Sequence, residues 1–313
     1  MNLWIKVAVS IGVLAVLAFV LPWSEVVESA EALPASVWLI VLLGFLIGHL
    51  VGASKWTLVL RGFGAPLPWR GGTRYYAAGL FANLCLPGIV GGDVIKATLA
   101  TKRTHRAEAV ILGSVADRVI DTVALMAILG AGSMIAGARV ADATLRLALI
   151  LVIAGLVAGG LVGMLMLRRP LRSWPPRLRR IIARVLVAFR HLRRRPAVPI
   201  IAFLLALSMQ SFFVLLNAHI GDALAIEVPT SVWFVVWPLA KLAGLLPVSL
   251  GGLGVRDATQ GALLTGFGVP AARGVVASLV WQSVLIAGGL LAGLYWWLGS
   301  RRNGQSLLEQ RDV

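Results

Sequence analysis

The chain has 313 residues, of which 59% are apolar and only 13% are charged, and its mean hydropathy is +0.89. Soluble domains average roughly 45–50% apolar and about 25% charged residues, so this composition excludes an ordinary soluble protein and predicts an all-α polytopic membrane protein. Lys and Arg exceed Asp and Glu by 16. Eleven of the arginines fall between residues 168 and 195, where a cytoplasmic loop facing anionic lipid explains them without nucleic-acid binding.

About 20 apolar residues make one membrane crossing. On that basis the sequence predicts six full transmembrane helices, at 3–22, 37–60, 111–136, 145–167, 197–217 and 275–298. The first resembles a signal peptide, but we expect an uncleaved span. Two further hydrophobic segments, 71–100 and 231–268, are interrupted by proline, glycine clusters and charges. Non-helical backbone survives at membrane depth only beside protein or a watery cavity, so these broken segments are the first place to look for a site.

The distribution of charges predicts how the segments cross the membrane. The loop 22–34 carries three glutamates and no Lys or Arg, which places it outside and the N-terminus in the cytoplasm. Basic residues precede and follow 71–100, so this segment is expected to enter and leave from the cytoplasm as a re-entrant hairpin. The segment 231–268 must then form an opposed re-entrant hairpin from the outside, which leaves the tail 301–313 cytoplasmic. Arg139, Arg146 and Arg273 oppose this assignment.

The two broken segments share a pattern at a constant offset of 160 residues. The matches are Leu86-Pro87 with Leu246-Pro247, Gly91-Gly92 with Gly251-Gly252, and Lys96 with Arg256. Chance alignment of common residues is one explanation, but opposed broken elements related by a repeat are typical of transporters with a substrate near the midplane. We therefore predict one transmembrane domain over 1–300, with inverted-repeat halves at 37–167 and 197–298 and a basic cytoplasmic linker at 168–196.

Charged residues follow both glycine pairs. Asp93 and Lys96 lie three residues apart, on one side of a helix that would begin at Gly91 and Gly92. In the second segment, Arg256 and Asp257 follow Gly251, Gly252 and Gly254 in the same way. Glycines let backbone approach a ligand, a helix N-terminus offers free amides to an anion, and a nearby cation would complete a phosphate site. The alternative is that each charged pair is a structural salt bridge tying a loop.

The predicted span 111–136 carries three charged residues. Asp117 and Asp121 share one face, whereas Arg118 points about 100° away. Asp121 either pairs with Lys96, Lys241 or Arg256 or carries a proton coupled to transport. Elsewhere, Lys241 either snorkels outward or lines a cavity, Asn83 and Gln282 either bind a headgroup or bridge helices, and Lys55 is expected to be an interfacial anchor. No metal and no cofactor is expected.

Three stretches, NLCLPGIVGGDVIK, SVADRVIDTVAL and PVSLGGLGVRD, resemble the lysylphosphatidylglycerol synthase transmembrane family, whose members are also called flippase-like proteins. The resemblance spans nearly the whole chain, and GGLGVR is its most specific string. Lys96 stands where the pattern usually has Arg, and Asp257 where it usually has Glu. The resemblance implies lipid translocation, and we expect it here without the aminoacyl-transferase domain of the two-part synthase.

The sequence therefore predicts a flippase, not an enzyme, that moves a phosphate-bearing lipid across the bacterial inner membrane, with both termini cytoplasmic. The cargo is a phospholipid, an aminoacyl-phospholipid, or an isoprenoid- or hopanoid-type lipid. Arg256 and Lys96 would hold the phosphate, while the neighbouring aspartates would orient these cations or exchange a proton. The alternatives are an integral-membrane enzyme acting on lipid phosphates or lipid-linked sugars, and a scaffold for a lipid-synthesising enzyme.

Two remaining patterns concern packing. Gly155, Gly159 and Gly163 recur every four residues, which permits close helix packing within the fold or in a homo-oligomer. Residues 177–195 predict a basic amphipathic helix that lies along the membrane surface and contacts anionic lipid.

Overall fold

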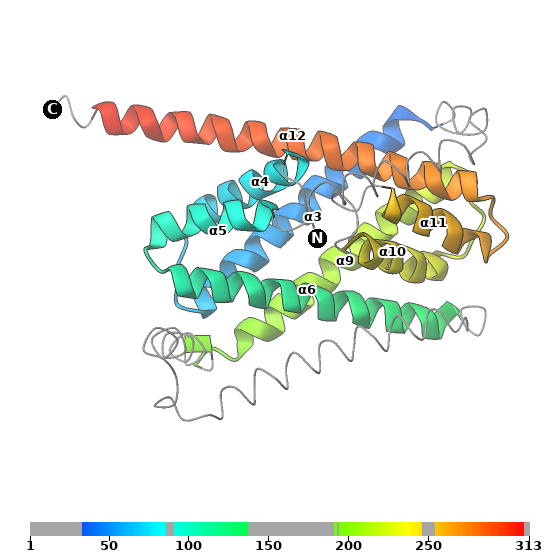
Figure 1. Cartoon of the computed structure of the whole chain (residues 1–313), viewed down its shortest axis with the longest axis horizontal. Coiled ribbons are helices and arrows are strands. Elements are labelled where there is room, and N and C mark those ends of the chain that lie inside the picture. Colours follow the sequence, from blue (N-terminus) through cyan, green and yellow to red (C-terminus); the bar gives the residue numbers. More distant parts are fainter. Residues whose placement is uncertain (1–32, 86–90, 137–190, 193, 246–253, 310–313) are drawn as a thin grey trace, which may run out of the picture.

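The computed structural model describes residues 33–85, 91–136, 191–192, 194–245 and 254–309 (Figure 1). This part of the chain holds eight helices and no strand, which confirms the all-helical prediction there. The predicted spans 3–22 and 145–167, the glycine repeat within the latter and nearly all of the basic stretch 168–195 lie outside the described residues.

Four helices are long and apolar enough to cross a membrane. They are α3 (Ala35–Gly62), α6 (Ala107–Ala136), α9 (Ala197–Ala223) and the portion Ala271–Ser300 of α12 (Ala271–Glu309). At 1.5 Å rise per residue, roughly 20 residues span the hydrocarbon core, and each of these helices exceeds that length. The predicted spans 37–60, 111–136, 197–217 and 275–298 are thus confirmed as helices, and the chain is a multi-pass membrane protein.

Each broken segment contains a pair of shorter helices. In the first, α4 (Trp69–Cys85) is followed by α5 (Gly91–Thr104); in the second, α10 (Thr230–Leu245) is followed by α11 (Val255–Thr265). Both α4 and α10 end two residues before a proline, Pro87 or Pro247. Proline disfavours helical backbone in the residue before it, so the sequence predicts an interruption at these two positions. Within each pair, the two helices pack against one another.

The described helices form two sets of four at a nearly constant offset. Adding 160 to the first residues of α3, α4, α5 and α6 gives 195, 229, 251 and 267, and α9, α10, α11 and α12 begin at residues 197, 230, 255 and 271. The packing follows the same correspondence. If α3, α4, α5 and α6 correspond to α9, α10, α11 and α12, then α4 packs on α12 just as α10 packs on α6. The other principal helix contacts of the described part correspond in the same way.

The two pairs of short helices lie on opposite sides of the molecule, and α3 and α9 cross between them (Figure 1). On one side α12 packs along α4 and α11, and on the other α6 packs along α5 and α10. The main apolar core gathers side chains of α3, α9, α10 and α12, including Phe45, Phe213, Trp233 and Trp281, each at most 4% exposed. The two short pairs therefore lie on either side of a centre to which α3 and α9 contribute.

Candidate functional site

A cavity of about 290 Å³ lies at this centre, and all eight described helices contribute to its lining. Nine of the residues considered for the site from sequence line it: Asn83, Gly92, Asp93, Lys96, Arg118, Asp121, Lys241, Arg256 and Gln282. Gly91, Gly254 and Asp257 are described but do not line it. Gly251 and Gly252 lie outside the described residues. The broken segments and the span 111–136 are thus brought together at one place.

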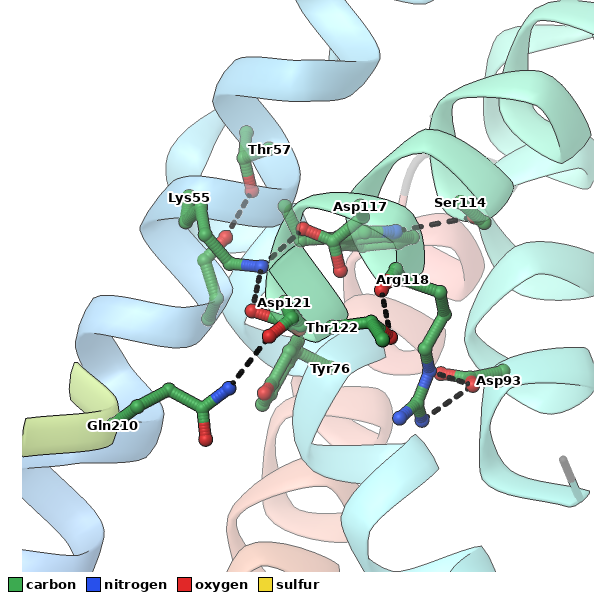
Figure 2. Close-up of polar contacts among 12 residues, drawn as sticks. Lys55, Thr57, Tyr76, Asp93, Ser114, Asp117, Arg118, Asp121, Thr122 and Gln210 are labelled. Atoms are coloured by element: carbon green, nitrogen blue, oxygen red, sulfur yellow. Dashed lines mark hydrogen bonds and ion pairs between the residues drawn. The ribbon is translucent and has the colours of Figure 1, made fainter. Parts of the chain in front are cut away.

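Lys55 of α3 is the centre of a buried ion cluster (Figure 2). Its Nζ lies 2.6 Å from Asp117 Oδ1 and 2.6 Å from Asp121 Oδ1, and Lys55 is only 1% exposed. The predicted common face of Asp117 and Asp121 is confirmed, because both reach the same ammonium. The expectation that Lys55 is an interfacial anchor is wrong, since two carboxylates from α6 compensate its charge inside the fold. Asp121 pairs with Lys55 rather than with any of the three cations predicted for it.

A second ion cluster joins α5 to α6. Lys96 Nζ lies 2.9 Å from Asp93 Oδ1, one helical turn away. Arg118 Nε donates a 2.5 Å hydrogen bond to Asp93 Oδ2 (Figure 2). Arg118 reaches α5 because it points away from the face that Asp117 and Asp121 share. Lys96 is further enclosed by the rings of Trp56 and Tyr76, whose centroids lie 5.1 and 4.9 Å from its Nζ.

Arg256 of α11 lines the cavity from the other half of the chain. Its Nη2 donates to Gln282 Oε1 at 2.7 Å and to Asp257 Oδ1 at 3.2 Å, while Nε is buried with no hydrogen-bond partner among the described residues. Asp257, at 1% exposure, lies behind Arg256. Its Oδ2 accepts the Gly254 N–H at 3.0 Å and its Oδ1 accepts the Ser278 hydroxyl at 2.5 Å. Asp257 therefore caps α11 and ties it to α12.

Lys241 of α10 lines the cavity rather than snorkelling outward. Its Nζ donates to Gln210 Oε1 at 2.6 Å and lies 4.7 Å from the centroid of the Trp237 ring. Gln210 is itself 1% exposed, and its Nε2 donates to the backbone carbonyl of Asp121 at 2.9 Å. Among the described residues, no carboxylate lies within 4.0 Å of Lys241 Nζ, so its described contacts are to neutral groups.

Two of the glycine amides near the starts of α5 and α11 already donate to side chains and are not free for an anion. Gly92 N–H donates to Asn83 Oδ1 at 2.9 Å, and Gly254 N–H donates to Asp257. The expectation of open helix N-termini is wrong for these two amides, because side chains of the same segments already accept their hydrogen bonds. An anion in the cavity must therefore find its donors mainly on cationic side chains.

Sequence reasoning missed an aromatic wall. The cavity is also lined by Phe45, His49, Tyr76, Phe213, Trp237 and Trp281. These rings contact one another: the centroids of Phe213 and Trp281 are 5.7 Å apart, and those of Trp237 and Trp281 are 6.2 Å apart. Aromatic residues spread over five helices give no local signal in the sequence. Gln210 does give one, since a lone amide within an apolar span needs a buried partner.

The fold and this site define a multi-pass helical membrane protein whose cavity is lined by charged and aromatic side chains. The chain belongs to the lysylphosphatidylglycerol synthase transmembrane family, because the model described as the lysylphosphatidylglycerol synthase TM region matches residues 3–293. This confirms the resemblance carried by the three sequence stretches. No curated protein and no solved structure shows significant similarity to the chain.

Proposed function

We propose that the protein is a lipid translocase of the bacterial inner membrane, which moves a phosphate-bearing lipid between leaflets without converting it chemically. The observation that carries this proposal is a cavity lined by Lys96, Lys241 and Arg256 among helices long enough to cross a membrane. An ionisable side chain at membrane depth costs about 2.5–3.5 kcal/mol on insertion scales, so several of them around one cavity indicate a pathway for a polar group.

The size of the cavity indicates which part of a lipid it receives. A volume of about 290 Å³ corresponds to about ten water molecules at roughly 30 Å³ each. A phosphate headgroup fits such a space, whereas two acyl chains do not. The headgroup would therefore cross through the cavity while the apolar chains stay in the bilayer.

The arrangement of the helices supports alternating access. The two sets of four helices share an offset near 160 residues, exchange their packing partners, and place the two short pairs on opposite sides of the centre (Figure 1). Combined with the charge distribution of the loops, this favours an inverted repeat in which the short pairs re-enter the membrane from opposite faces, with both termini cytoplasmic. Rocking of one repeat against the other would open the cavity to each leaflet in turn.

The test is a translocation assay in proteoliposomes carrying fluorescent phospholipids or isoprenoid phosphates, with and without a proton gradient. Loss of fluorescence on adding a membrane-impermeant quencher reports lipid in the outer leaflet. We expect the wild type to move one class of lipid, and Arg256→Gln and Asp121→Asn to reduce the rate at least tenfold. Arg103→Gln is the matched control, because Arg103 is exposed near the end of α5 and does not line the cavity.

Three results would contradict the proposal. Equal rates in protein-free vesicles, wild type and variants, with or without the gradient, exclude translocation of these lipids. A chemically altered lipid recovered after incubation favours the membrane enzyme. If translocation is absent and cells tolerate Arg256→Gln and Asp121→Asn, a scaffold for a lipid-synthesising enzyme is the better explanation.

A further inference from the structure

The cations around the cavity are unequally compensated by carboxylates. Five cations line it or pair with its lining: Lys55, Lys96, Arg118, Lys241 and Arg256. The first three belong to α3, α5 and α6, where Asp93, Asp117 and Asp121 supply carboxylates. The last two belong to α10 and α11, where the described carboxylate contact is that of Asp257 to Arg256. The half of the cavity formed by α10 and α11 is therefore the more electropositive.

Lys96 has little capacity left for a ligand. Its Nζ contacts Asp93 at 2.9 Å and Asp117 at 3.9 Å, lies against two aromatic rings, and belongs to a residue that is 6% exposed. A phosphate would have to displace these partners before it could bind. The sequence match between Lys96 and Arg256 therefore does not extend to their surroundings.

Lys241 and Arg256 keep donors available. The ammonium of Lys241 has three donors, of which one bonds Gln210, and the guanidinium of Arg256 has five, of which the described bonds use only those of Nη2. The Nε of Arg256 is buried without a partner among the described residues. A buried donor without an acceptor destabilises the fold, and a ligand oxygen that reached Nε after a shift of the Arg256 side chain would remove that cost.

The charge balance of the same cluster limits the ligand. The five cations are opposed by four carboxylates, those of Asp93, Asp117, Asp121 and Asp257. With every one of these groups ionised, the described cluster has a net charge of one positive unit. The stretches 86–90 and 246–253, which flank the short helices, contain no charged residue. A phosphodiester carries one negative charge and balances the cluster, whereas a phosphomonoester carries about −1.5 to −2 at pH 7 and overcompensates it.

We infer that Lys241 and Arg256 together bind the phosphate of a phosphodiester lipid, and that Gln210 positions Lys241 for this contact. This inference rests on the proposed lipid translocation and narrows its substrate class. Gln210 fixes the ammonium because its own amide is anchored to the Asp121 carbonyl, which aims Oε1 at Lys241. The Trp237 ring supports the same ammonium from the side. Lys96 instead pairs with Asp93 and Asp117 in the ion cluster of α5 and α6 and does not bind the ligand.

The experiment compares stability with transport in matched variants. Lys241→Met removes a cation that has no described carboxylate partner, so we expect its unfolding midpoint in detergent micelles to equal or exceed that of the wild type. Its rate of translocation of fluorescent phosphatidylglycerol should fall at least tenfold. The rate of Lys241→Arg should fall by less, because Arg keeps the positive charge. Lys96→Met should lower the unfolding midpoint, because it strips Asp93 and Asp117 of a partner. Lys102→Met, at an exposed position of α5, is the control.

The lipid class and the positioning residue are tested in the same vesicles. Wild type should move phosphatidylglycerol, a phosphodiester, about tenfold faster than phosphatidic acid with the same acyl chains. Gln210→Glu places a carboxylate beside Lys241 and brings the net charge of the cluster to zero, so it should slow the transport of both lipids, and that of the more highly charged phosphatidic acid the most. The inference is wrong if Lys241→Met transports normally, if Lys96→Met is stable yet as inactive as Lys241→Met, or if phosphatidic acid is preferred. If the wild type moves neither of these lipids nor any isoprenoid phosphate, the proposed function itself fails.

Discussion

At the scale of single residues, Lys55 shows how this fold accommodates charge at membrane depth. The ammonium is 1% exposed, and two carboxylates one helical turn apart on α6 contact it at 2.6 Å (Figure 2). Removing one partner of a buried ion pair leaves the other charges desolvated and uncompensated, which is far more costly than the pair itself. Lys55 therefore binds α3 to α6 at the wall of the cavity.

This arrangement predicts that Lys55→Met destabilises the protein by about 3–5 kcal/mol, because the buried Asp117 and the partly buried Asp121 lose the cation that they share. Unfolding in mixed detergent micelles, followed by circular dichroism, measures the loss. Lys102→Met at the exposed part of α5 should change stability by no more than about 0.5 kcal/mol. Equal stability of the two variants would show that the Lys55 cluster does not hold α3 and α6 together.

At the scale of elements, α4 and α5 approach one another through two glycines. A Cβ added at Gly79 would lie 2.8 Å from the Gly92 carbonyl oxygen, and a Cβ added at Gly92 would clash with the Gly79 carbonyl and the Asn83 amide. The same Asn83 accepts the Gly92 N–H. This contact sets the direction in which α5 carries Asp93 and Lys96 toward α6.

Gly92→Ala is therefore expected to cost about 1–3 kcal/mol, because backbone rather than a flexible side chain must move to admit the methyl group. Gly130→Ala provides the contrast: it lies in the helical interior of α6 and its added Cβ meets nothing within 4 Å. That change should stabilise the protein by about 0.5–1 kcal/mol through helix propensity alone. Chemical unfolding measures the free energy of unfolding of both variants. A change of the same sign in the two would contradict this account.

The elements also show what sequence can and cannot predict here. Pro87 and Pro247 predict an interruption after α4 and after α10 because proline acts on its immediate neighbours, so these breaks can be predicted from local sequence. The charged residues that follow these interruptions in the sequence, Asp93, Lys96 and Arg256, line the cavity, so they too could be found from local sequence. The contacts of Lys55 with Asp117 and Asp121 could not be predicted from local sequence, since they depend on how α3 packs against α6. Likewise, the contact of Gln210 with Lys241 depends on the packing of α9 against α10.

At the scale of the whole molecule, the exchange of packing partners between the two sets of helices gives a physical basis for two alternative states. Because α4 packs on α12 as α10 packs on α6, the proposed alternating access would let each half take up the packing of the other. The charges of the two sets differ: Lys55, Lys96 and Arg118 of the first set are matched by three aspartates, whereas Lys241 and Arg256 of the second are matched by Asp257 alone.

Alternating access predicts that fixing one short pair to the other stops transport. Leu80 of α4 and Gly244 of α10 both line the cavity, so cysteines at these positions, in a Cys85→Ser background, can be bridged by a flexible bis-maleimide. We expect the translocation rate of the bridged protein to fall at least tenfold, because the cavity then keeps one width and opens to one leaflet only. Each single-cysteine variant treated with the same reagent controls for blockage of the cavity by the adduct. An unchanged rate in the bridged protein would mean that the two pairs do not separate during transport, and that the lipid headgroup crosses a cavity of fixed shape.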